Sequence, residues 1–306
     1  MQIVISGASG LIGSCLVREL PRLDPSVHCV KLVRRPAGAA TAPDEIPWDP
    51  GQGRLESDRL EGADVVLHLA GASIAGRRWS ARYKDEILHS RVAGTQTLTQ
   101  ALAGLRQPPR LFLTASAVGY YGNRSPEESV DEESRPGEGF LSRVCRAWET
   151  AADPARDAGI RVVHLRFGMV LSPAGGALAR LLPVFRLGLG GRIGDGRQPV
   201  PWIALDEIPL IVRHLLGTAA VDGPVNAVAP DVPDNAGWTR TLARVLRRPA
   251  ALPVPTFALR LLFGEMADEA LLGGARVRPR RLLESGYSFR WPDLEPALRD
   301  MLSVSR

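Results

Sequence analysis

MQIVISGASGLIG, residues 1–13, is the stretch that decides the fold of this chain. The apolar run from Gln2 to Ser6 predicts a buried strand, and the apolar face that begins at Leu11 predicts a helix that reaches Leu20. The turn between the two elements carries three glycines, Gly7, Gly10 and Gly13. A strand that runs directly into a glycine-rich turn and a helix is typical of the first βαβ unit of a nucleotide-binding fold.

Glycines at this spacing and in this context have three physical uses. They permit a tight turn, they let the backbone approach a pyrophosphate group, and they let the helix pack closely on the strand. The free amides at the helix start then attract the phosphates. We therefore predict a dinucleotide-binding site at this turn. The alternative is a turn with a structural role alone.

The end of the second predicted strand discriminates between the two nicotinamide dinucleotides. A site selective for NAD carries an acidic residue about twenty residues past the glycine turn, where it binds the ribose 2′-hydroxyl. This chain has Arg34 and Arg35 there instead. Because guanidinium groups bind phosphate well, the pair predicts NADP as the cofactor. The alternative is a solvated loop in which the two arginines bind nothing.

Further apolar runs alternate with helical patterns over the first 170 residues, which indicates βαβ units. Runs such as RLFLTA (110–115) are apolar at both alternate positions, as in strands that helices cover on both faces. The pattern predicts an α/β fold with a Rossmann-type, doubly wound and mostly parallel sheet. The expected strands are Gln2–Ser6, Val27–Val33, Ala63–Leu69, Arg110–Ala115 and Arg161–Phe167, and the expected helices are Leu11–Leu20, Ala81–Ala103 and Phe140–Ala152.

The character of the chain changes after residue 170, where glycine- and proline-rich loops such as GLGGRIGDGRQPVP (188–201) appear. A helix near Asp206–Leu216, a strand at Val225–Ala229 and a helical, arginine-rich segment from Pro253 are expected to follow. We expect the strand to return to the first sheet. The predicted domains are an NADP-binding domain, 1–170 plus about 200–229, and a smaller substrate lobe, 171–199 and 230–306.

The composition excludes several classes of protein. The 306 residues are 45% hydrophobic and 23% charged, as in soluble globular proteins, and no apolar run is long enough to cross a membrane. The net charge is +5, and Lys31 and Lys84 are the only lysines. Because the arginines are scattered rather than clustered, we expect no nucleic-acid partner. No leader-like segment precedes the first strand, so we expect a cytoplasmic protein without a membrane partner.

Other chemistries lack their usual motifs. Cys15, Cys29 and Cys145 are widely spaced and the five histidines are dispersed, so we predict no metal site and reduced, mostly packed cysteines. There is no GxSxG nucleophile motif and no Walker lysine. The acidic stretch PEESVDEES (126–134) predicts a solvated loop.

Several stretches together resemble one known family. They are GASGLIG (7–13), DVVLHLAGASI (64–74), SRVAGTQTL (90–98), TASAVGYYG (114–122) and WIALDEI (202–208). They resemble the atypical extended short-chain dehydrogenase/reductases of the sugar-nucleotide-epimerase-like type, over essentially the whole chain. The segment 264–298 resembles the small C-terminal domain of that subfamily. The resemblance implies a Rossmann domain with a smaller substrate lobe.

The resemblance also implies where catalysis would occur. In typical relatives a serine polarises the reacting oxygen, a tyrosine exchanges its proton, a lysine four residues later lowers the tyrosine pKa, and an asparagine supports a proton relay. The serine corresponds to Ser116. Leu141, Cys145 and Arg91 stand at the tyrosine, lysine and asparagine positions, and an alignment shifted by one residue would place Phe140 and Val144 at the first two. This departure puts the usual mechanism in doubt, since a positioned acid or base contributes about 10²–10⁴ in rate.

Two tyrosines follow Ser116 closely in the chain and are the available phenols. We therefore take Ser116, Tyr120 and Tyr121 as the candidate catalytic residues, the alternative being that both tyrosines only line or pack a substrate cleft. Arg166, Arg192 and Arg197 are candidates for holding an anionic substrate group; scattered arginines are the alternative. By motif and resemblance, the expected cofactor-binding residues are Gly7, Ser9, Gly10, Leu11, Ile12, Gly13, Arg34, Arg35, Leu69, Ala70, Gly71, Arg91, Thr114, Phe167 and Val170.

These inferences point to an NADP-dependent oxidoreductase or epimerase-like enzyme that acts by hydride transfer on a small-molecule substrate. A homo-oligomer is compatible with them. The absence of three of the four catalytic positions favours a different class, an NADP-binding regulator that has lost catalysis. The retained Ser116 and the two tyrosines favour the enzyme. Whether NADPH is turned over discriminates between the two.

Overall fold

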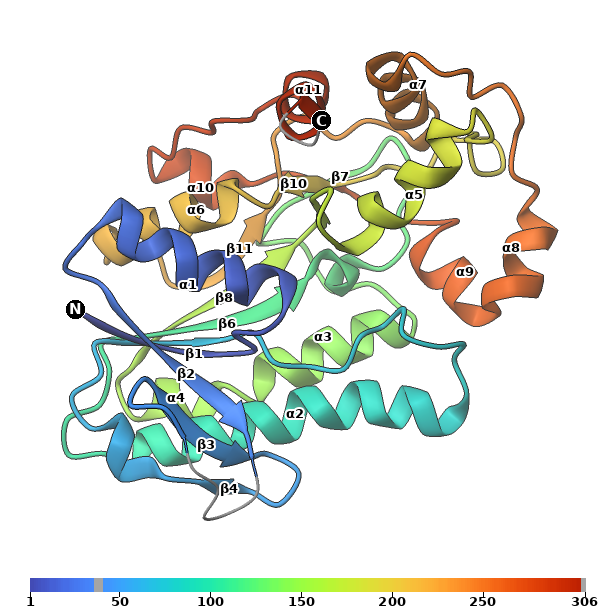
Figure 1. Cartoon of the computed structure of the whole chain (residues 1–306). Coiled ribbons are helices and arrows are strands. Elements are labelled where there is room, and N and C mark those ends of the chain that lie inside the picture. The colour runs from blue at the N-terminus through green and yellow to red at the C-terminus, as the bar shows by residue number, and fades with distance from the viewer. Residues whose placement is uncertain (36–40, 304–306) are drawn as a thin grey trace. The chain divides into compact units, whose positions relative to one another are not determined.

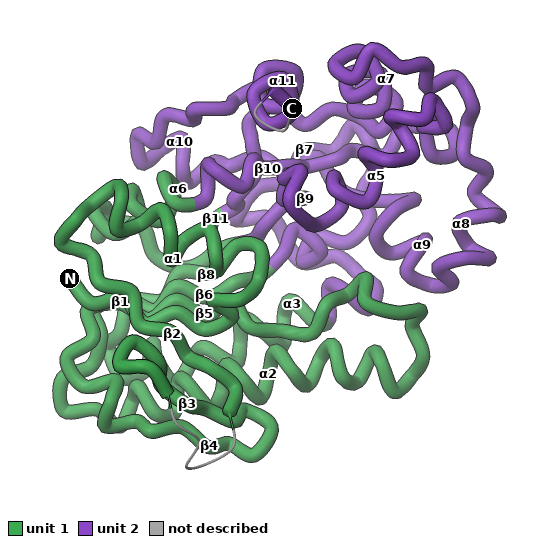
Figure 2. Tube along the Cα trace, in the orientation of Figure 1, with its two compact units in different colours: residues 1–116, 144–165, 209–225 green, residues 117–143, 166–208, 226–306 purple. Residues whose placement is uncertain are grey.

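The computed structural model describes residues 1–35 and 41–303. It divides into two compact units, and neither is a continuous segment (Figure 2). Unit 1 comprises residues 1–116, 144–165 and 209–225, and unit 2 comprises residues 117–143, 166–208 and 226–306. Residues 117–143 and 166–170, which the sequence places in the first domain, thus group with unit 2. The boundaries of the predicted functional domains remain a prediction.

An eight-stranded sheet forms the centre of unit 1, in the order β11-β8-β6-β5-β1-β2-β3-β4. Its strands are β1 (Gln2–Ser6), β2 (His28–Arg34), β3 (Glu45–Asp49), β4 (Arg54–Leu55), β5 (Val65–His68), β6 (Leu111–Ala117), β8 (Arg161–Phe167) and β11 (Gly223–Ala227). The pairs β1–β2, β1–β5, β2–β3 and β5–β6 are parallel, and β4 is antiparallel to β3. The predicted mostly parallel α/β sheet is confirmed.

Helices cover both faces of this sheet, as the apolar strands require. Figure 1 shows α1 (Leu11–Leu23) and α6 (Glu207–Gly217) on one face, with α2 (Ala81–Ala103) and α4 (Asp153–Asp157) on the other. Val4, Val66 and Phe112, from three adjacent strands, are fully buried with Leu98 of α2. Because alternate residues of a strand point to opposite faces, Ile3 and Ile5 of β1 are buried on the side of α1.

The sequence predicted the main elements of unit 1 to within a few residues. The helices α1, α2 and α3 (Phe140–Thr150) and the strands β1 and β8 begin where expected. The expected return of the chain to the sheet is also correct, since β11 lies beside β8, although it begins two residues earlier than predicted. The sequence did not predict β3, because Pro47 within it cannot donate a ladder hydrogen bond and reads as an interruption.

Unit 2 contains two small parallel sheets and most of the C-terminal helices. β9 (Met169–Leu171) pairs with β10 (Trp202–Ala204), and β7 (Ser129–Val130) pairs with β12 (Arg276–Val277). Its helices are α5 (Gly176–Arg186), α7 (Asn235–Leu246), α8 (Thr256–Phe263), α9 (Glu265–Ala270), α10 (Arg280–Glu284) and α11 (Leu294–Ser303). Its main apolar core joins α5, α7 and α11 around Trp202 and Trp238. Within the described residues, no helix has the length and apolar composition needed to cross a membrane.

Candidate functional site

The glycine turn after β1 leaves no room for side chains. Gly7 has a φ of +69°, and a Cβ there would lie 2.9 Å from the backbone nitrogen of Ala70. A Cβ on Gly13 would lie 2.2 Å from the carbonyl oxygen of Gly7. The first glycine therefore allows the turn and its contact with the chain after β5, and the third allows α1 to approach the turn, as predicted from the motif.

The amino end of α1 is open to an anion. Gly10 is its N-cap residue and provides no side-chain hydrogen bond, and the first turn carries no acidic residue. The first amides of a helix have no partner within the helix, and the helix dipole gives this end a partial positive charge. Ser9 and Gly10 are exposed, Leu11 and Ile12 are half-buried, and Gly13 is buried. This arrangement fits a bound pyrophosphate.

A second loop lies at the same edge of the sheet. Because β1 and β5 are parallel and Ser6 lies opposite His68, the residues after each strand leave the sheet side by side. The Ser6 hydroxyl accepts hydrogen bonds from the amides of Leu69 (3.1 Å) and Ala70 (3.3 Å). The predicted residues Leu69, Ala70 and Gly71 are thereby fixed beside the glycine turn.

His68 supports this loop from inside the sheet. Its Nδ1 lies 2.6 Å from Ser6 Oγ, and its ring stacks on Phe112 and meets Trp48 edge-on. Since the Ser6 oxygen already accepts two amides, we assign the hydroxyl proton to His68 Nδ1, which makes the neutral Nε2–H tautomer. Burial lowers the pKa of His68 to about 3. A histidine within an apolar strand gives no sequence signal of such a role, and His68 was not among the predicted site residues.

Arg34 and Arg35 lie at the carboxyl end of β2, the strand next to β1, and both are exposed. Arg35 Nη2 lies 3.3 Å from Glu45 Oε2, a salt bridge at the surface that contributes little stability. Parallel strands present their carboxyl ends at one edge of a sheet, so both guanidinium groups lie on the edge that carries the glycine turn. Their position fits the predicted contact with a 2′-phosphate.

Arg91 of α2 is a partly buried cation beside this edge. Its side chain passes Gly71 so closely that a Cβ there would lie 3.4 Å from Cζ, and its guanidinium lies 4.9 Å from the ring centre of Trp148. Nη1 donates to the Ile87 carbonyl at 3.0 Å. Desolvation lowers the pKa of Arg91, and Cys145 and Tyr83 partly offset this effect. Among the described residues no carboxylate pairs with Arg91, which is therefore suited to an anionic ligand.

Ser116 ends the unit 1 part of β6 and is buried, with Thr114 two residues before it in the same strand. Its hydroxyl donates to Glu149 Oε1 of α3 at 2.7 Å. Glu149 is the second-last residue of α3 and was not among the predicted site residues. The serine is thus paired with a carboxylate rather than with a phenol or an amine.

Tyr120 and Tyr121 lie in unit 2, in a short 3-10 helix (Val118–Tyr121) after β6. Tyr121 is fully buried; it donates to Asn226 Oδ1 at 2.7 Å and accepts from Arg166 Nη1 at 2.9 Å. Burial raises the pKa of Tyr121 to about 12. A phenol with these partners and this pKa is a poor proton acceptor at neutral pH. Tyr120, half-buried, packs its ring 3.4 Å from the Arg166 guanidinium carbon.

Arg166, predicted to hold a substrate anion, is 2% exposed and is engaged with these two tyrosines. The other two predicted arginines are exposed and lie in the glycine-rich loop. Arg192 donates to the carbonyls of Gly194 and Asp195, and Arg197 pairs with Glu127 at 2.9 Å. Phe167 ends β8 and Val170 lies in β9. Their roles remain predictions.

The acidic stretch 126–134 is only partly the solvated loop that the sequence predicts. Glu127, Glu128 and Glu133 are exposed, but Ser129 and Val130 form β7 and Glu132 is buried, where its Oε1 accepts a hydrogen bond from the backbone amide of Asn226 at 2.9 Å. Its other oxygen has no hydrogen-bond partner among the described residues, and burial raises the pKa of Glu132. The sequence gives no signal that one of the five acidic residues in this stretch is buried. The burial of Glu132 depends on its contact with Asn226, which lies 94 residues away in the chain.

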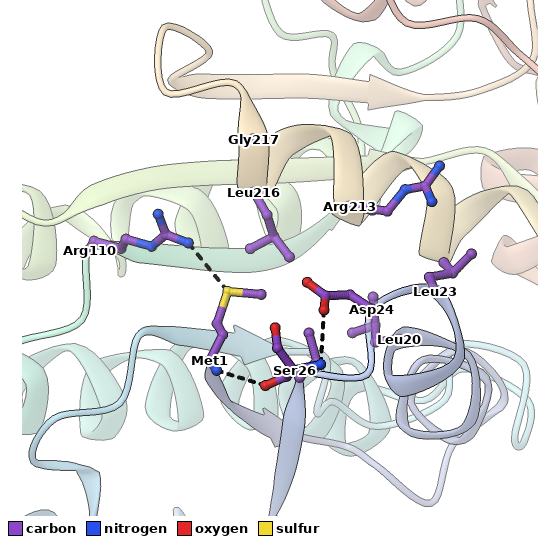
Figure 3. A pocket seen from close by; sticks show the side chains of 10 residues that line it. Met1, Leu20, Leu23, Asp24, Ser26, Arg110, Arg213, Leu216 and Gly217 are labelled. Atoms are coloured by element: carbon purple, nitrogen blue, oxygen red, sulfur yellow. Dashed lines mark hydrogen bonds between the residues drawn. The ribbon is translucent and has the colours of Figure 1, made fainter.

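A cavity of about 310 Å³ lies in unit 1, at the amino ends of the strands (Figure 3). Met1, Leu20, Leu216, Arg110 and Arg213 are among its lining residues, and none of the predicted site residues lines it. The C-terminal ends of α1 and α6 face it, through Leu20, Leu23, Leu216 and Gly217. The predicted site instead lies at the opposite, carboxyl edge of the sheet. In the described ranges, 1–35 and 41–303, no three His, Cys, Asp or Glu side chains cluster as metal ligands would.

Comparison with known proteins agrees with this geometry. The model of the NAD dependent epimerase/dehydratase family matches residues 3–224, and a domain of unknown function, DUF1731, matches residues 254–301. The chain is 40% identical over 296 residues to the epimerase family protein Mb2239 of Mycobacterium bovis, covering 97% of this chain and 96% of that protein.

Two solved structures are also similar along nearly the whole chain. The crystal structure of human epimerase family protein SDR39U1 (isoform2) with NADPH has a TM-score of 0.88 and 33% identity, with 99% of each chain covered. The nucleoside-diphosphate sugar epimerase from Corynebacterium glutamicum has a TM-score of 0.80 and 34% identity, with 99% of this chain and 58% of that chain covered. These similarities confirm the resemblance inferred from the sequence, including the separate C-terminal domain. The chain therefore belongs to the NAD dependent epimerase/dehydratase family.

Proposed function

We propose that this chain is an NADP(H)-dependent oxidoreductase or epimerase-like enzyme that acts by hydride transfer on a small-molecule substrate. One observation carries the proposal: the open glycine turn and two exposed arginines, Arg34 and Arg35, lie at the same edge of one parallel sheet. The NADPH in the crystal structure of the human relative supports the choice of cofactor.

Different residues of unit 1 would hold different parts of the cofactor. The turn from Gly7 to Gly13 and the first amides of α1 would hold the pyrophosphate, and Arg34 with Arg35 would hold the 2′-phosphate. Arg91, beside Gly71, would supply a positive charge near the ligand. When bound, NADP(H) supplies or accepts a hydride at its nicotinamide ring.

Ser116 and Glu149 provide a route for the accompanying proton. The Ser116 hydroxyl directs its own proton to Glu149, so its lone pairs are available to a substrate hydroxyl. In the oxidation direction, the substrate proton passes to the serine oxygen as the serine proton passes to the carboxylate; reduction reverses both transfers. This pair would replace the tyrosine and lysine, whose positions hold Leu141 and Cys145.

A regulator that binds NADP(H) without turnover is the second candidate. The observation that favours it is that neither Leu141 nor the buried Cys145 can exchange a proton as a tyrosine and lysine pair does. The two candidates share the nucleotide site and differ only in chemistry.

The nucleotide site is tested by measuring the dissociation constants of NADPH and NADH by fluorescence titration. We expect NADPH to bind at least tenfold more tightly, equivalent to about 1.4 kcal/mol. Arg34→Gln with Arg35→Gln should remove this preference and leave NADH binding unchanged. Arg59→Gln, an exposed arginine of the same unit, is the matched control. Equal affinities for both nucleotides in the wild-type protein would contradict the proposal.

Chemistry is tested separately, by following NADPH oxidation with a panel of aldehydes, ketones and nucleotide sugars. The enzyme proposal expects turnover that Ser116→Ala and Glu149→Gln each reduce by about 10²-fold or more, with unchanged NADPH affinity. Tight NADPH binding without turnover of any compound would favour the regulator.

A further inference from the structure

Unit 2 carries a patch of exposed apolar side chains. The described residues include nine large apolar side chains that are exposed, and eight of them belong to two short stretches, 184–189 and 252–263. We call these eight the apolar patch: Val184, Leu187, Leu189, Leu252, Phe257, Leu261, Leu262 and Phe263. Phe257 and Leu261 are each 72% exposed and Leu187 is 75% exposed. Scattered exposed leucines are normal, but a concentration of this kind marks an interaction surface.

The two stretches lie next to one another. The loop after α5 is bonded to the segment before α8: the amide of Gly194 donates to the Val254 carbonyl at 3.1 Å, and the amide of Val254 donates to the Arg192 carbonyl at 2.8 Å. Gly191 and Leu252 approach so closely that a Cβ on Gly191 would lie 1.6 Å from the Leu252 carbonyl oxygen. The two stretches are therefore neighbours within unit 2, which brings their exposed residues near one another.

The helix α8 has the apolar composition of a buried helix, but most of its side chains are exposed. Its sequence is TFALRLLF, and Leu259 is its one buried residue. A helix that is apolar almost all round is normally buried. Leaving Phe257, Leu261 and Leu262 in water costs free energy unless another surface covers them.

The charge around the patch is mostly positive. Residues 176–194 and 244–263 together contain seven arginines and no aspartate or glutamate, and Asp195, Glu265, Asp268 and Glu269 follow them directly in the chain. Arg244 pairs with Glu295 and Arg260 with Asp268, both from outside these stretches. Arg186, Arg247 and Arg248 are exposed, and no carboxylate of the described residues pairs with them. We call these three arginines the arginine rim; their positive charge is available to a partner.

We propose that the apolar patch and its arginine rim bind the surface of a bilayer that contains anionic lipids. Apolar and aromatic side chains that enter the acyl boundary, next to cations at the level of the headgroups, are the features of an interfacial membrane site. A nucleic acid would match the arginines but not eight apolar side chains. A second copy of the chain would bring the same three arginines of the rim, Arg186, Arg247 and Arg248, to the contact. The sequence predicted no membrane partner because it contains no spanning segment, which interfacial binding does not need.

The proposal is tested by co-sedimentation of the full chain with two kinds of vesicle. One contains phosphatidylcholine alone, and the other contains phosphatidylcholine with about 30% phosphatidylglycerol, an anionic lipid. We expect at least tenfold stronger partitioning onto the anionic vesicles, and a loss of this binding in high salt as the charges are screened. Phe257→Ser with Leu261→Ser should reduce the binding about tenfold or more, and Arg247→Gln with Arg248→Gln should reduce it and its salt dependence.

Two controls keep the result specific. Leu283→Ser removes the ninth exposed apolar side chain, which lies on α10 outside the patch, and Arg82→Gln removes an exposed arginine of unit 1; neither should change vesicle binding. All variants should keep the wild-type unfolding temperature, because the altered side chains are exposed. No binding to anionic vesicles, or binding that the patch variants leave unchanged, would overturn the proposal. A dimer that Phe257→Ser with Leu261→Ser converts to a monomer would overturn it in favour of a second copy.

Discussion

At the scale of the residue, one buried pair connects the sheet to the candidate site. Ser6 and His68 end two adjacent parallel strands, and the serine hydroxyl holds the amides of Leu69 and Ala70. Its proton goes to a histidine that must stay neutral to accept it. The pairing satisfies the serine hydroxyl and His68 Nδ1, whereas His68 Nε2 is buried without a hydrogen-bond partner among the described residues. Each unsatisfied buried group costs about 1–3 kcal/mol.

His68 should make the stability of the protein depend on pH. Its pKa is about 3 in the folded protein against about 6.5 in the unfolded chain, so between these values only the unfolded chain binds the proton. Stability due to His68 is complete above pH 6.5 and falls toward pH 3, by up to about 1.4 kcal/mol per pH unit. Urea unfolding from pH 7.5 to 4.5 should show this loss in the wild-type protein but not in His68→Asn.

The difference between the two curves isolates His68 from the carboxylates, which titrate in both proteins. His89→Asn, at an exposed position of α2, is the control and should run parallel to wild type. If wild type and His68→Asn lose stability equally as the pH falls, folding does not lower the pKa of His68, and the prediction is wrong.

At the scale of the element, a side chain from the sheet donates hydrogen bonds to the carbonyls at and just after the end of α6. The Arg161 guanidinium at the start of β8 donates to the carbonyls of Leu215, Thr218 and Val221 at 2.8–2.9 Å. The last carbonyls of a helix lack partners within it, and a cation at this end also complements the dipole. Arg161 therefore joins the end of α6 to the central sheet.

Replacing Arg161 with methionine should destabilise unit 1. The loss of three hydrogen bonds from a charged donor that is half-buried is expected to cost about 2–3 kcal/mol, measured as a lower urea midpoint with an unchanged slope. The neighbouring Arg110 is exposed and makes no hydrogen bond to a backbone carbonyl, so Arg110→Met should stay within about 0.5 kcal/mol of wild type. An Arg161→Met midpoint equal to that of wild type would contradict the assigned role.

At the scale of the whole molecule, the candidate site is built from residues far apart in the chain. Its parts follow β1, β2, β5 and β6, and only the parallel register brings Gly7, Arg34, Gly71 and Ser116 to one edge. A ligand held by all of them stabilises the fold as a unit, because it binds the folded chain alone.

NADPH at 100 times its dissociation constant should therefore raise the free energy of unfolding by about 2.7 kcal/mol, seen as a higher unfolding temperature. Gly13→Ala should abolish the shift, since its Cβ would collide with the Gly7 carbonyl. Gly217→Ala, where a Cβ meets open space, is the matched control and should keep the full shift. A Gly13→Ala protein that folds and is stabilised as strongly as wild type would exclude the turn as the nucleotide site.

The sequence by itself determined the α/β class, the order of the main strands and helices, and the glycine turn with its two arginines. These follow from local patterns: apolar periodicity, glycine spacing, and the position of a residue along one βαβ unit. The sequence also predicted the family and its C-terminal domain, because the motifs extend over the whole chain.

Only the tertiary structure decided which polar side chains meet. Ser116 with Glu149, Tyr121 with Arg166 and Asn226, and the inward turn of Glu132 join residues that are 33 to 105 positions apart. The exposure of α8 is equally invisible in a sequence whose apolar content predicts burial. Local patterns report which face of an element is apolar; they do not report what covers that face, because the partner comes from a distant part of the chain.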